Sequence, residues 1–396
     1  MKFETSVPHS IGMELEFQLL DENTLDLVDG ILPLMDYYSD HPYITPEFIQ
    51  NTVEVASKVC YSISELETHF YDVVNELNDR CHSLGMRLCA AGTHPFSQSL
   101  AHITPKPRYL KMEAAEAYRS HTQITFATHV HIGMRSGEEA ISVMKKLKPY
   151  LSLLMGLSAN SPFWHGQDTG YASYRHRVLA TARSYGMPPS FSSWDEFVHF
   201  YHLAKQAGIY ESINDIHWDI RPRPKLGTLE VRIMDAQLTI HDAILRAAFL
   251  QALVAYLREQ PTFNHYHAEY EYEYWLQKDN IYQASRLGME ANNIDHATET
   301  VSNLRQVFDS VFYPIVSFFE KAENSDSNID PNYLYRLREQ VEKSKIGYLL
   351  QRHIYAESLS LKKISNTLVH QLESDLNQFS NPQKRRAIDL TQTTIL

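Results

Sequence analysis

The segment Gly12–Asp21, "GMELEFQLLD", carries the pattern that decides the fold of this chain. Successive side chains of a β-strand alternate between its two faces, so an apolar and a polar face can be assigned directly. The apolar face would consist of Met13, Leu15, Phe17 and Leu19. The other face carries Glu14 and Glu16 side by side. Such a carboxylate pair repels itself unless water screens it or a cation binds between the two groups.

Three later segments repeat this alternation of apolar and polar residues. The polar face of "TVEVAS" carries Glu54, that of "HVHIGM" carries His129 and His131, and that of "GTLEVRIM" carries Glu230 and Arg232. A single strand of this kind is most simply explained by a face in contact with water. Four such strands should then show mixed Lys, Thr, Ser and Gln, whereas these show glutamates, histidines and an arginine. Carboxylates with an occasional imidazole are ligands for Mg²⁺ or Mn²⁺, so the pattern predicts a sheet face that holds metal ions and a phosphorylated substrate.

Arginines are the other groups that would bind phosphate, because the sequence has neither a GxxxxGK[ST] loop nor a GxGxxG loop after a strand. The candidates are Arg175, Arg177, Arg221, Arg223, Arg232 and Arg286. For each of them the alternative is an ordinary ion pair. Arg232 is favoured because it shares a strand face with Glu230.

The order of predicted elements indicates an α+β fold. Strands are predicted at 11–19, 51–57, 87–92, 123–133 and 227–234. Helices are predicted at 62–85, 138–157, 194–207 and 241–259, and from about 296 onward only helical patterns occur, including 331–345 and 359–378. No long linker divides the chain, so we expect one catalytic domain over 1–396, with a helical region at 296–380 packed on the sheet body.

Composition excludes several classes of protein. The formal net charge of −12 argues against a nonspecific nucleic-acid binder. Three cysteines without CxxC spacing favour a reducing compartment, and the first residues lack the apolar segment of a signal peptide. The most apolar helical stretch, Ile244–Leu257, is short for a membrane span and contains Arg246. We therefore expect a cytoplasmic protein that binds neither nucleic acid nor membrane.

Several motifs together resemble a known family. In order, they are "GMELEFQLLD", "AAGTHPF", "HVHIGM", "LSANSPFWHGQDTGYASYR", "WDIRPRPKLGTLEVRIMDA" and "KDNIYQASRLGMEA". Over roughly residues 10–350 the chain resembles the bacterial carboxylate–amine ligases of the second glutamate–cysteine ligase type. This resemblance implies a glutamine-synthetase-like fold, in which helices pack on the outer side of a curved, largely antiparallel sheet. It also implies ATP-dependent amide bond formation with Mg²⁺, or with Mn²⁺ in its place.

The resemblance also assigns roles to residues of this chain. Its metal ligands fall on Glu14, Glu16, Glu54, His131 and Glu230. Substrate binding falls on Tyr171 and Arg175, ATP binding on Arg232 and Arg286, and the catalytic roles on Glu230 and Arg232. Many relatives have three successive glutamates where this chain has Leu15 between two, and Leu15 is expected to point into the core.

The expected reaction joins a small-molecule carboxylate to an amine through an acyl phosphate, with release of ADP and phosphate. A γ-glutamyl product and weak glutamate–cysteine ligase activity are included in this expectation. The first alternative is a metal-dependent hydrolase that uses the same carboxylates and histidine, and the second is a nucleotide-binding regulator without turnover. The exposed edges of an antiparallel sheet also suggest a homodimer.

Overall fold

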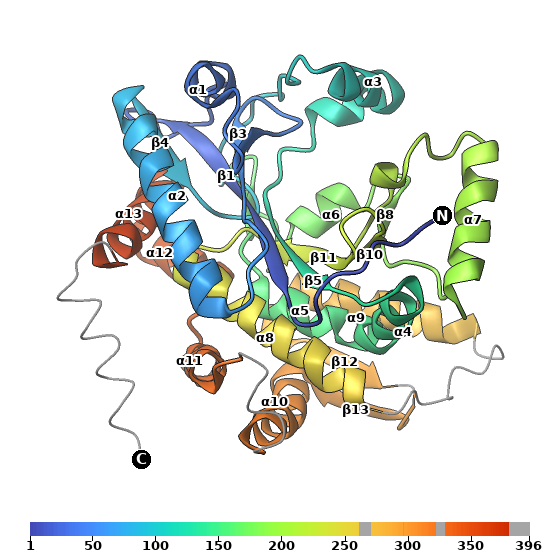
Figure 1. The fold of residues 1–396 in the computed structure, drawn as a ribbon. Coiled ribbons are helices and arrows are strands. Elements are labelled where there is room, and N and C mark those ends of the chain that lie inside the picture. Colours follow the sequence, from blue (N-terminus) through green and yellow to red (C-terminus); the bar gives the residue numbers. More distant parts are fainter. Residues whose placement is uncertain (261–270, 296, 322–328, 380–396) are drawn as a thin grey trace.

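The computed structural model describes residues 1–260, 271–295, 297–321 and 329–379, and a seven-stranded antiparallel sheet forms its centre (Figure 1). The strand order is β10-β11-β5-β1-β3-β2, and β4 pairs with the end of β1. The strands are β1 (Ile11–Asp21), β2 (Ile44–Pro46), β3 (Thr52–Ala56), β4 (Met86–Cys89), β5 (Ala127–Gly133), β10 (Ile220–Arg223) and β11 (Thr228–Asp235). The five predicted strands are therefore all present, and β2 and β10 are added at the two edges.

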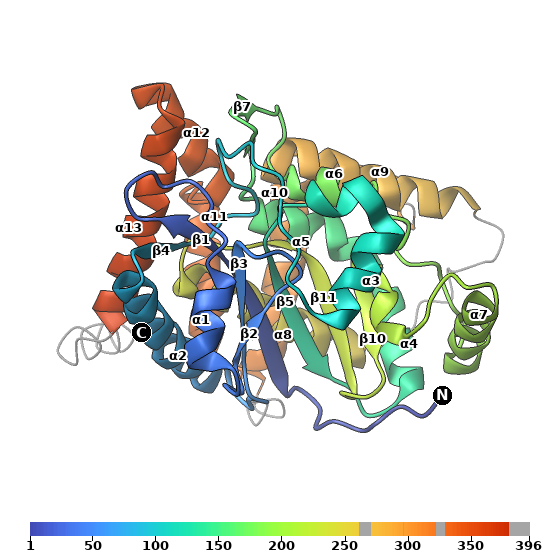
Figure 2. The same ribbon diagram turned by 90° about the horizontal axis from the view of Figure 1, so that it is seen from above.

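One face of this sheet is buried under helices. The covering helices are α2 (Ile63–Ser83), α4 (Gly137–Leu147), α5 (Leu151–Ser158) and α8 (Ile240–Glu259). Leu15, Val55, Val130 and Val231 point into this core and are at most 5% exposed. Figures 1 and 2 show α3 (Pro107–Glu116) and α6 (Arg175–Leu179) on the opposite side of the strands from α8. The polar strand faces thus look toward α3 and α6.

Local signals explain where the helices begin and end. The side chain of Ser62 accepts a hydrogen bond from the backbone N–H of Glu65, so α2 begins as predicted. The predicted helix at 138–157 is instead divided into α4 and α5 by a 3-10 turn at Lys148–Tyr150. Pro149 lies in this turn, and proline lacks the N–H that a continuous helix requires.

Helix α8 is longer than the apolar stretch noted in the sequence. Its 20 residues are long and apolar enough to cross a bilayer, but 83% of its apolar window is buried inside the protein. Arg246 is 2% exposed and donates a hydrogen bond from Nε to the carbonyl oxygen of Leu157, 3.2 Å away. α8 is therefore the central helix of the core, and the cytoplasmic location stays a prediction.

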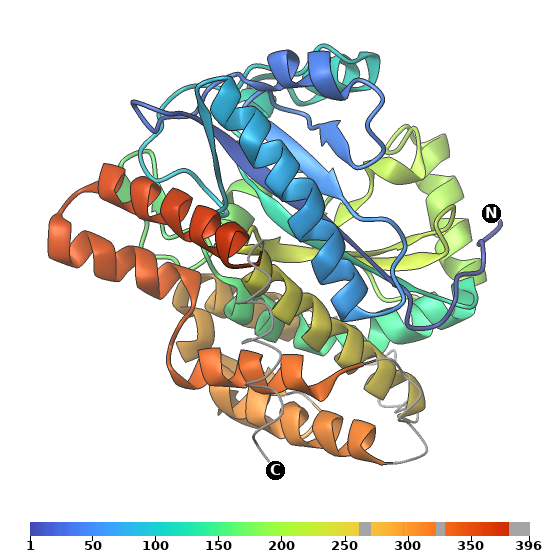
Figure 3. The same ribbon diagram turned by 60° about the vertical axis from the view of Figure 1, so that its left-hand side comes forward.

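The C-terminal helices pack mainly on other helices. They are α10 (Leu304–Glu320), α11 (Pro331–Glu342), α12 (Gly347–Ser358) and α13 (Leu361–Phe379). α10 and α11 contact α8, and α13 contacts α2, α8 and β4 (Figure 3). The segment Thr300–Asn303 was expected to be helical but forms β13, which pairs with β12 (Asn292–Asp295). Its β-branched Thr300 and Val301 suit a strand. The assignment of the whole chain to one domain stays a prediction.

The remaining elements surround the polar side and the edges. They are α1 (Ile31–Tyr38), α7 (Trp194–Gln206), α9 (Glu271–Leu287), and the two-residue strands β6 (Phe163–Trp164), β7 (Gln167–Asp168), β8 (Tyr185–Gly186) and β9 (His217–Trp218). β8 and β9 pair in parallel, whereas β6 and β7 form an antiparallel pair.

Candidate active site

The register of the sheet brings the predicted site residues together in cross-strand pairs. Glu16 on β1 lies opposite Glu54 on β3, and Glu14 lies opposite His129 on β5. On the other side of β5, His131 lies opposite Glu230 on β11. Directly opposed residues of an antiparallel sheet have side chains within contact distance. One face of four adjacent strands therefore collects these glutamates and histidines.

Glu14, His131 and Glu230 form the first potential metal site, here called the histidine trio. Each of them offers a ligand atom within 4.8 Å of the others. Nε2 of His131 lies 3.2 Å from Oε1 of Glu14 and 4.0 Å from Oε1 of Glu230. Within the described parts of the chain this buried nitrogen has no hydrogen-bond partner, whereas Nδ1 lies 3.0 Å from the hydroxyl of Thr228. A buried imidazole nitrogen that faces two carboxylates has the donor set of a divalent metal site.

Glu16, Glu47 and Glu54 form the second potential site, the glutamate trio. Their closest carboxylate oxygens also lie within 4.8 Å of one another. Burial, followed by the charge of Glu47, raises the pKa of Glu16 to about 7. Burial and the charges of Glu14, Glu47 and Glu16 raise the pKa of Glu54 well above its ordinary value. Three carboxylates held this close fit a hard cation, which would replace their mutual repulsion by attraction.

Sequence reasoning did not find Glu47. This residue follows β2 and lies outside the alternating strands, so no local pattern distinguishes it. It joins the trio because β2 pairs with β3, where Thr45 lies opposite Glu54. The Thr45 hydroxyl also donates a 3.1 Å hydrogen bond to Oε1 of Glu54.

Three arginines surround Glu230, which is 1% exposed. Arg221 donates to it from Nε at 2.8 Å and from Nη2 at 3.2 Å, and Arg232 donates from Nη1. Nε of Arg223 lies 3.5 Å from Oε2. Burial disfavours the charged form of Glu230, but Arg221, Arg232 and His131 outweigh it and hold its pKa well below the ordinary value. In this state Arg221 and Arg223 make ion pairs, the alternative considered from the sequence.

His129 is a second residue that the predicted ligand set omitted. Its Nδ1 lies 3.1 Å from Oε2 of Glu14 and 3.4 Å from Nη1 of Arg232. Burial, followed by the charge of Arg232, lowers the pKa of His129 to about 3. The neutral ring thus donates from Nδ1 to Glu14 and fixes that carboxylate beside His131. The alternating pattern had placed His129 on this face, but the resemblance supplied only His131.

Tyr171 and Arg286, predicted to bind different ligands, both lie beside Tyr282 of α9. The hydroxyl oxygens of Tyr171 and Tyr282 are 3.3 Å apart, and Arg286 also interacts with the Tyr282 hydroxyl. The guanidinium of Arg177 lies 5.2 Å from the centre of the Tyr282 ring. No contact joins Tyr171 or Arg286 to either trio among the described residues. Their roles in ligand binding stay predictions.

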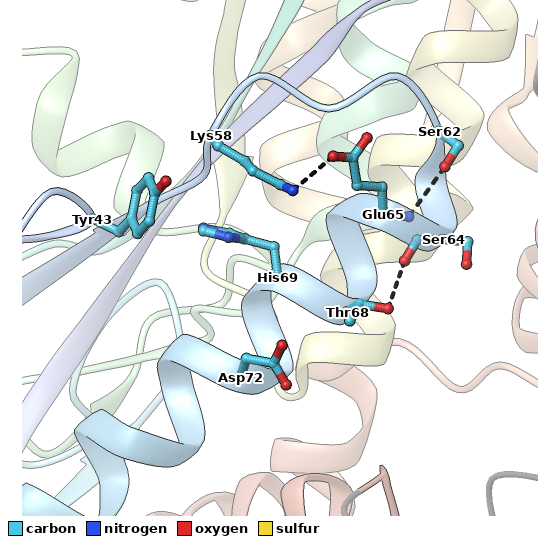
Figure 4. A pocket seen from close by; sticks show the side chains of 8 residues that line it. All are labelled: Tyr43, Lys58, Ser62, Ser64, Glu65, Thr68, His69 and Asp72. Atoms are coloured by element: carbon cyan, nitrogen blue, oxygen red, sulfur yellow. Dashed lines mark hydrogen bonds and ion pairs between the residues drawn. The ribbon is translucent and has the colours of Figure 1, made fainter.

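A pocket of about 600 Å³ opens elsewhere, at the N-terminal end of α2 (Figure 4). Lys58, Ser62, Glu65 and His69 are among its lining residues, and none of the predicted site residues lines it. Nζ of Lys58 lies 2.7 Å from Oε1 of Glu65, and Ser62 caps the helix. The charges and hydrogen-bonding groups of these residues pair with one another or cap the helix, so the pocket gives no indication of a catalytic or metal site.

Comparison with known proteins agrees with this geometry. The model of glutamate-cysteine ligase family 2 matches residues 10–358. The chain belongs to this family. It is 39% identical to "Putative glutamate--cysteine ligase 2" of Trichormus variabilis, over 95% of this chain and 96% of that protein. A similarly named protein of Legionella pneumophila (strain Corby) is 35% identical over 73% of this chain and 76% of its own length.

Solved structures show the same fold at low sequence identity. Glutamate–cysteine ligase of Francisella tularensis in complex with AMP matches with a TM-score of 0.69 and 15% identity, over 99% of this chain and 92% of that chain. A bifunctional glutathione synthetase of Pasteurella multocida matches with a TM-score of 0.70 and 14% identity, over 93% of this chain and 53% of that chain. The expected glutamine-synthetase-like α+β fold is confirmed. Family membership confirms the enzyme class, an ATP-dependent carboxylate–amine ligase.

Within this ligase, Asp235 at the end of β11 joins three segments of the site. Its Oδ2 accepts hydrogen bonds from the backbone N–H of Asn160 at 2.8 Å and from the hydroxyl of Ser161 at 2.7 Å. Its Oδ1 accepts from the hydroxyl of Ser173 at 2.9 Å. A Cβ at Gly92 would lie 2.7 Å from Cγ of Asp235, so the strand end in "AAGTHPF" requires glycine for this close approach.

These contacts also position Arg175, which is 2% exposed. The hydroxyl of Ser161 accepts a 3.0 Å hydrogen bond from the backbone N–H of Arg175. Among the residues that the structure describes, the guanidinium makes only long bonds, of 3.4 Å to the carbonyl of Ile233 and 3.3 Å to that of Arg232, and its buried Nε has no partner. A buried guanidinium beside the strands whose donors are only partly satisfied can bind an anionic ligand.

Replacing Asp235 by alanine is expected to lower the free energy of unfolding by about 3 kcal/mol, because buried donors would lose their acceptor. Chemical denaturation of the purified protein measures this change. Asp195→Ala, on the exposed first turn of α7, is the control and should change stability by less than about 0.5 kcal/mol. A loss at Asp235 no larger than that of the control would contradict its joining role.

Proposed function

We propose that this ligase forms a γ-glutamyl amide from glutamate, an amine and ATP, through a γ-glutamyl phosphate. The observation that carries the proposal is the pair of trios on one sheet face, with Arg232 next to the histidine trio. Glutamate is proposed as the carboxylate, and cysteine as one amine to test, because the family and its relatives are named for those substrates. The cofactor would be Mg²⁺, or Mn²⁺ in its place.

Two kinds of residue would act on the nucleotide. The histidine trio and the glutamate trio would hold divalent cations, which when bound reduce the repulsion between a carboxylate and a triphosphate and stabilise the charge of the moving phosphoryl group. Arg232 would donate hydrogen bonds to that group in the transition state. Arg175 would bind and orient a substrate carboxylate.

The proposed reaction has two steps. In the first, an oxygen of the substrate carboxylate attacks the γ-phosphorus, the bond to the β–γ bridging oxygen breaks, and ADP leaves. In the second, the amine nitrogen attacks the acyl carbon and loses a proton, and phosphate leaves with one oxygen of the original carboxylate. Electrostatic positioning by the strand side chains is the main contribution of the protein to both steps.

The direct test follows ADP with purified protein, ATP, Mg²⁺, glutamate and a set of amines that includes cysteine. A ligase releases ADP in proportion to amide, and only when carboxylate and amine are both present. Glutamate labelled with ¹⁸O in its γ-carboxylate should transfer one labelled oxygen to phosphate. Cleavage of an amide substrate in the absence of nucleotide would instead indicate the metal-dependent hydrolase. Stabilisation of the protein by ATP without turnover would indicate a regulator. A homodimer stays a prediction that sedimentation can test.

The glutamate trio predicts a pH-dependent metal affinity. A carboxyl group must lose its proton to bind a cation, and the pKa of Glu16 is raised to about 7. Mn²⁺ affinity without nucleotide should therefore rise on the order of tenfold per pH unit between about pH 6 and pH 7. Titration calorimetry in buffers of different ionisation enthalpy measures the affinity and the protons released. Glu65→Gln is the control and should keep the wild-type profile. A flat profile would contradict cation binding by this trio.

The same raised pKa predicts how stability changes with pH. A carboxyl whose pKa is higher in the folded than in the unfolded state contributes stability at low pH, and this contribution is lost as pH rises through the folded pKa of about 7 for Glu16. The metal-free protein should therefore unfold at a lower temperature at about pH 8 than at about pH 6. Saturating Mn²⁺ should restore the unfolding temperature at the higher pH.

A further inference from the structure

His217 lies on a segment that the proposed mechanism does not use, between Ile216, whose carbonyl accepts a hydrogen bond from the Arg221 guanidinium, and Asp219, whose carbonyl accepts a 2.8 Å hydrogen bond from the backbone N–H of Arg232. Its neighbours Ile216 and Trp218 are 1% and 5% exposed and belong to the apolar core. Alternation along β9 therefore directs His217 and Asp219 to the other side. There Oδ1 of Asp219 lies 3.2 Å from Nε2 of His176, the residue after Arg175. His217 thus points to the polar side of the sheet.

The ring of His217 is held in one orientation. Its Nδ1 lies 3.2 Å from the hydroxyl of Ser184, and its plane is stacked at 6° on the ring of Tyr185, with centroids 5.7 Å apart. Its backbone N–H also donates to the carbonyl of Ser184. No hydrogen bond to Nε2 is found in the described parts of the chain. In the tautomer in which Nδ1–H donates to the Ser184 hydroxyl, Nε2 carries the free lone pair and can accept a proton from a ligand.

The charges around His217 keep the ring neutral. Burial, followed by the guanidinium groups of Arg232, Arg221 and Arg108, holds the pKa of His217 well below its ordinary value, and Glu230 acts in the opposite direction. Arg232 also lies within electrostatic range of Tyr185. Phosphate groups bound by these arginines would offset their charge. The proton affinity of His217 would then rise when the substrates are bound.

Two further histidines on the strands of this face, His129 and His131, already contact carboxylates among the described residues. His129 is 2% exposed, and its ring nitrogens face Glu14 and Glu16. Nε2 of His131 faces the carboxylates of the histidine trio. Of these three rings, His217 is the one with an oriented nitrogen that is committed neither to a carboxylate nor to a metal site.

We propose that Nε2 of His217 accepts the proton that the ammonium form of the amine substrate must lose before its nitrogen can attack the acyl phosphate. This inference rests on the proposed ligase function and names a catalytic residue for its second step. The ammonium N–H bond breaks and its proton moves to His217, which later passes it to water. The neutral amine then forms the N–C bond, the bond between the acyl carbon and the phosphate oxygen breaks, and phosphate leaves with the second proton that the nitrogen loses. The reaction needs such an acceptor because the amine of a free amino acid has a pKa above the value of about 8 of a chain N-terminus, and is therefore mostly protonated at neutral pH.

The test compares two nucleophiles at neutral pH in the full-length protein with ATP, Mg²⁺ and glutamate. Cysteine must lose a proton before it can attack, whereas hydroxylamine is a weaker base that is already neutral and traps the acyl phosphate as a hydroxamate. His217→Gln is expected to lower kcat with cysteine on the order of 10²-fold. It should leave hydroxamate formation within about threefold of wild type, and KM for ATP within about twofold. His199→Gln, on the exposed side of α7, is the control and should change neither rate.

Ser184→Ala provides a second variant in case His217→Gln does not fold. It removes the hydroxyl beside Nδ1 and should lower the cysteine rate about fivefold while keeping the hydroxamate rate. Equal losses with both nucleophiles in a folded variant, or no loss with cysteine, would overturn the assignment of His217. If instead the wild type releases no ADP with either nucleophile, the proposed function fails, and this result is distinct from a failure of the inference.

Discussion

Glu230→Gln is expected to lower kcat by on the order of 10²-fold or more, because a preorganised charged group would be lost from the centre of the site. Glutamine keeps the size of the side chain but removes the charge that faces His131. It would also leave Arg221 and Arg232 buried without their carboxylate partner. The steady-state rate of ADP release with glutamate and the preferred amine measures the effect. Glu230→Ala should lose at least as much.

The control for this prediction is Glu65→Gln. Glu65 is also a glutamate in an ion pair, with Lys58 at 2.7 Å, but it lies at the pocket outside the predicted site. Its rate should stay within about twofold of wild type. Circular dichroism and thermal unfolding of Glu230→Gln separate loss of charge from loss of fold. A folded Glu230→Gln variant with near-wild-type ADP release would contradict the assignment of Glu230 to the site.

Arg232→Lys is expected to lower kcat by about 10²- to 10³-fold, the usual cost of removing one donor that stabilises transition-state charge. Lysine keeps the positive charge but cannot present the planar fork of a guanidinium, so it is not a conservative replacement at such a position. If Arg232 acts on the transferring phosphoryl group, kcat should fall far more than the affinity for ATP. Single-turnover ADP formation at saturating ATP measures the chemical step directly.

A second measurement separates this role from simple support of Glu230. If Arg232 only holds the carboxylate in place, its replacement should weaken Mn²⁺ binding as strongly as it slows the reaction. We expect Mn²⁺ affinity to stay within about threefold of wild type. Arg135→Lys is the matched control, because Arg135 is largely exposed and pairs with Glu139. An equal rate loss in the control, or none in Arg232→Lys, would reject the role.

Much of this site could be predicted because the strands alternate so regularly. Period two placed Glu14 and Glu16 on one face of β1 and Leu15 on the other, and Leu15 is indeed 5% exposed in the core. The same rule placed Glu54 and Glu230 on polar faces. Side-chain direction along a strand is a local property of the backbone, and local properties are available from sequence.

Local reasoning was less successful where neighbours in space decide the structure. The segment at 300–303 became a strand because residues 292–295 lie beside it. The long helix expected at 138–157 is divided at Pro149, because proline lacks the N–H that a continuous helix needs. The sequence contained this signal, but the prediction did not use it. Arg221 was one of several candidates for phosphate binding, with an ion pair as the alternative; it lies across from Glu230 in the register of β10 and β11 and makes an ion pair there.

By itself, the sequence determined the family, the fold and the faces on which the glutamates and histidines lie. The tertiary structure alone decided how these residues divide into a histidine trio and a glutamate trio, and it added Glu47 and His129 to the site. It also brought His217, on the short strand β9, next to the arginines. The physical reason is that strand pairing and register are set by contacts between residues far apart in the chain, which no local period encodes.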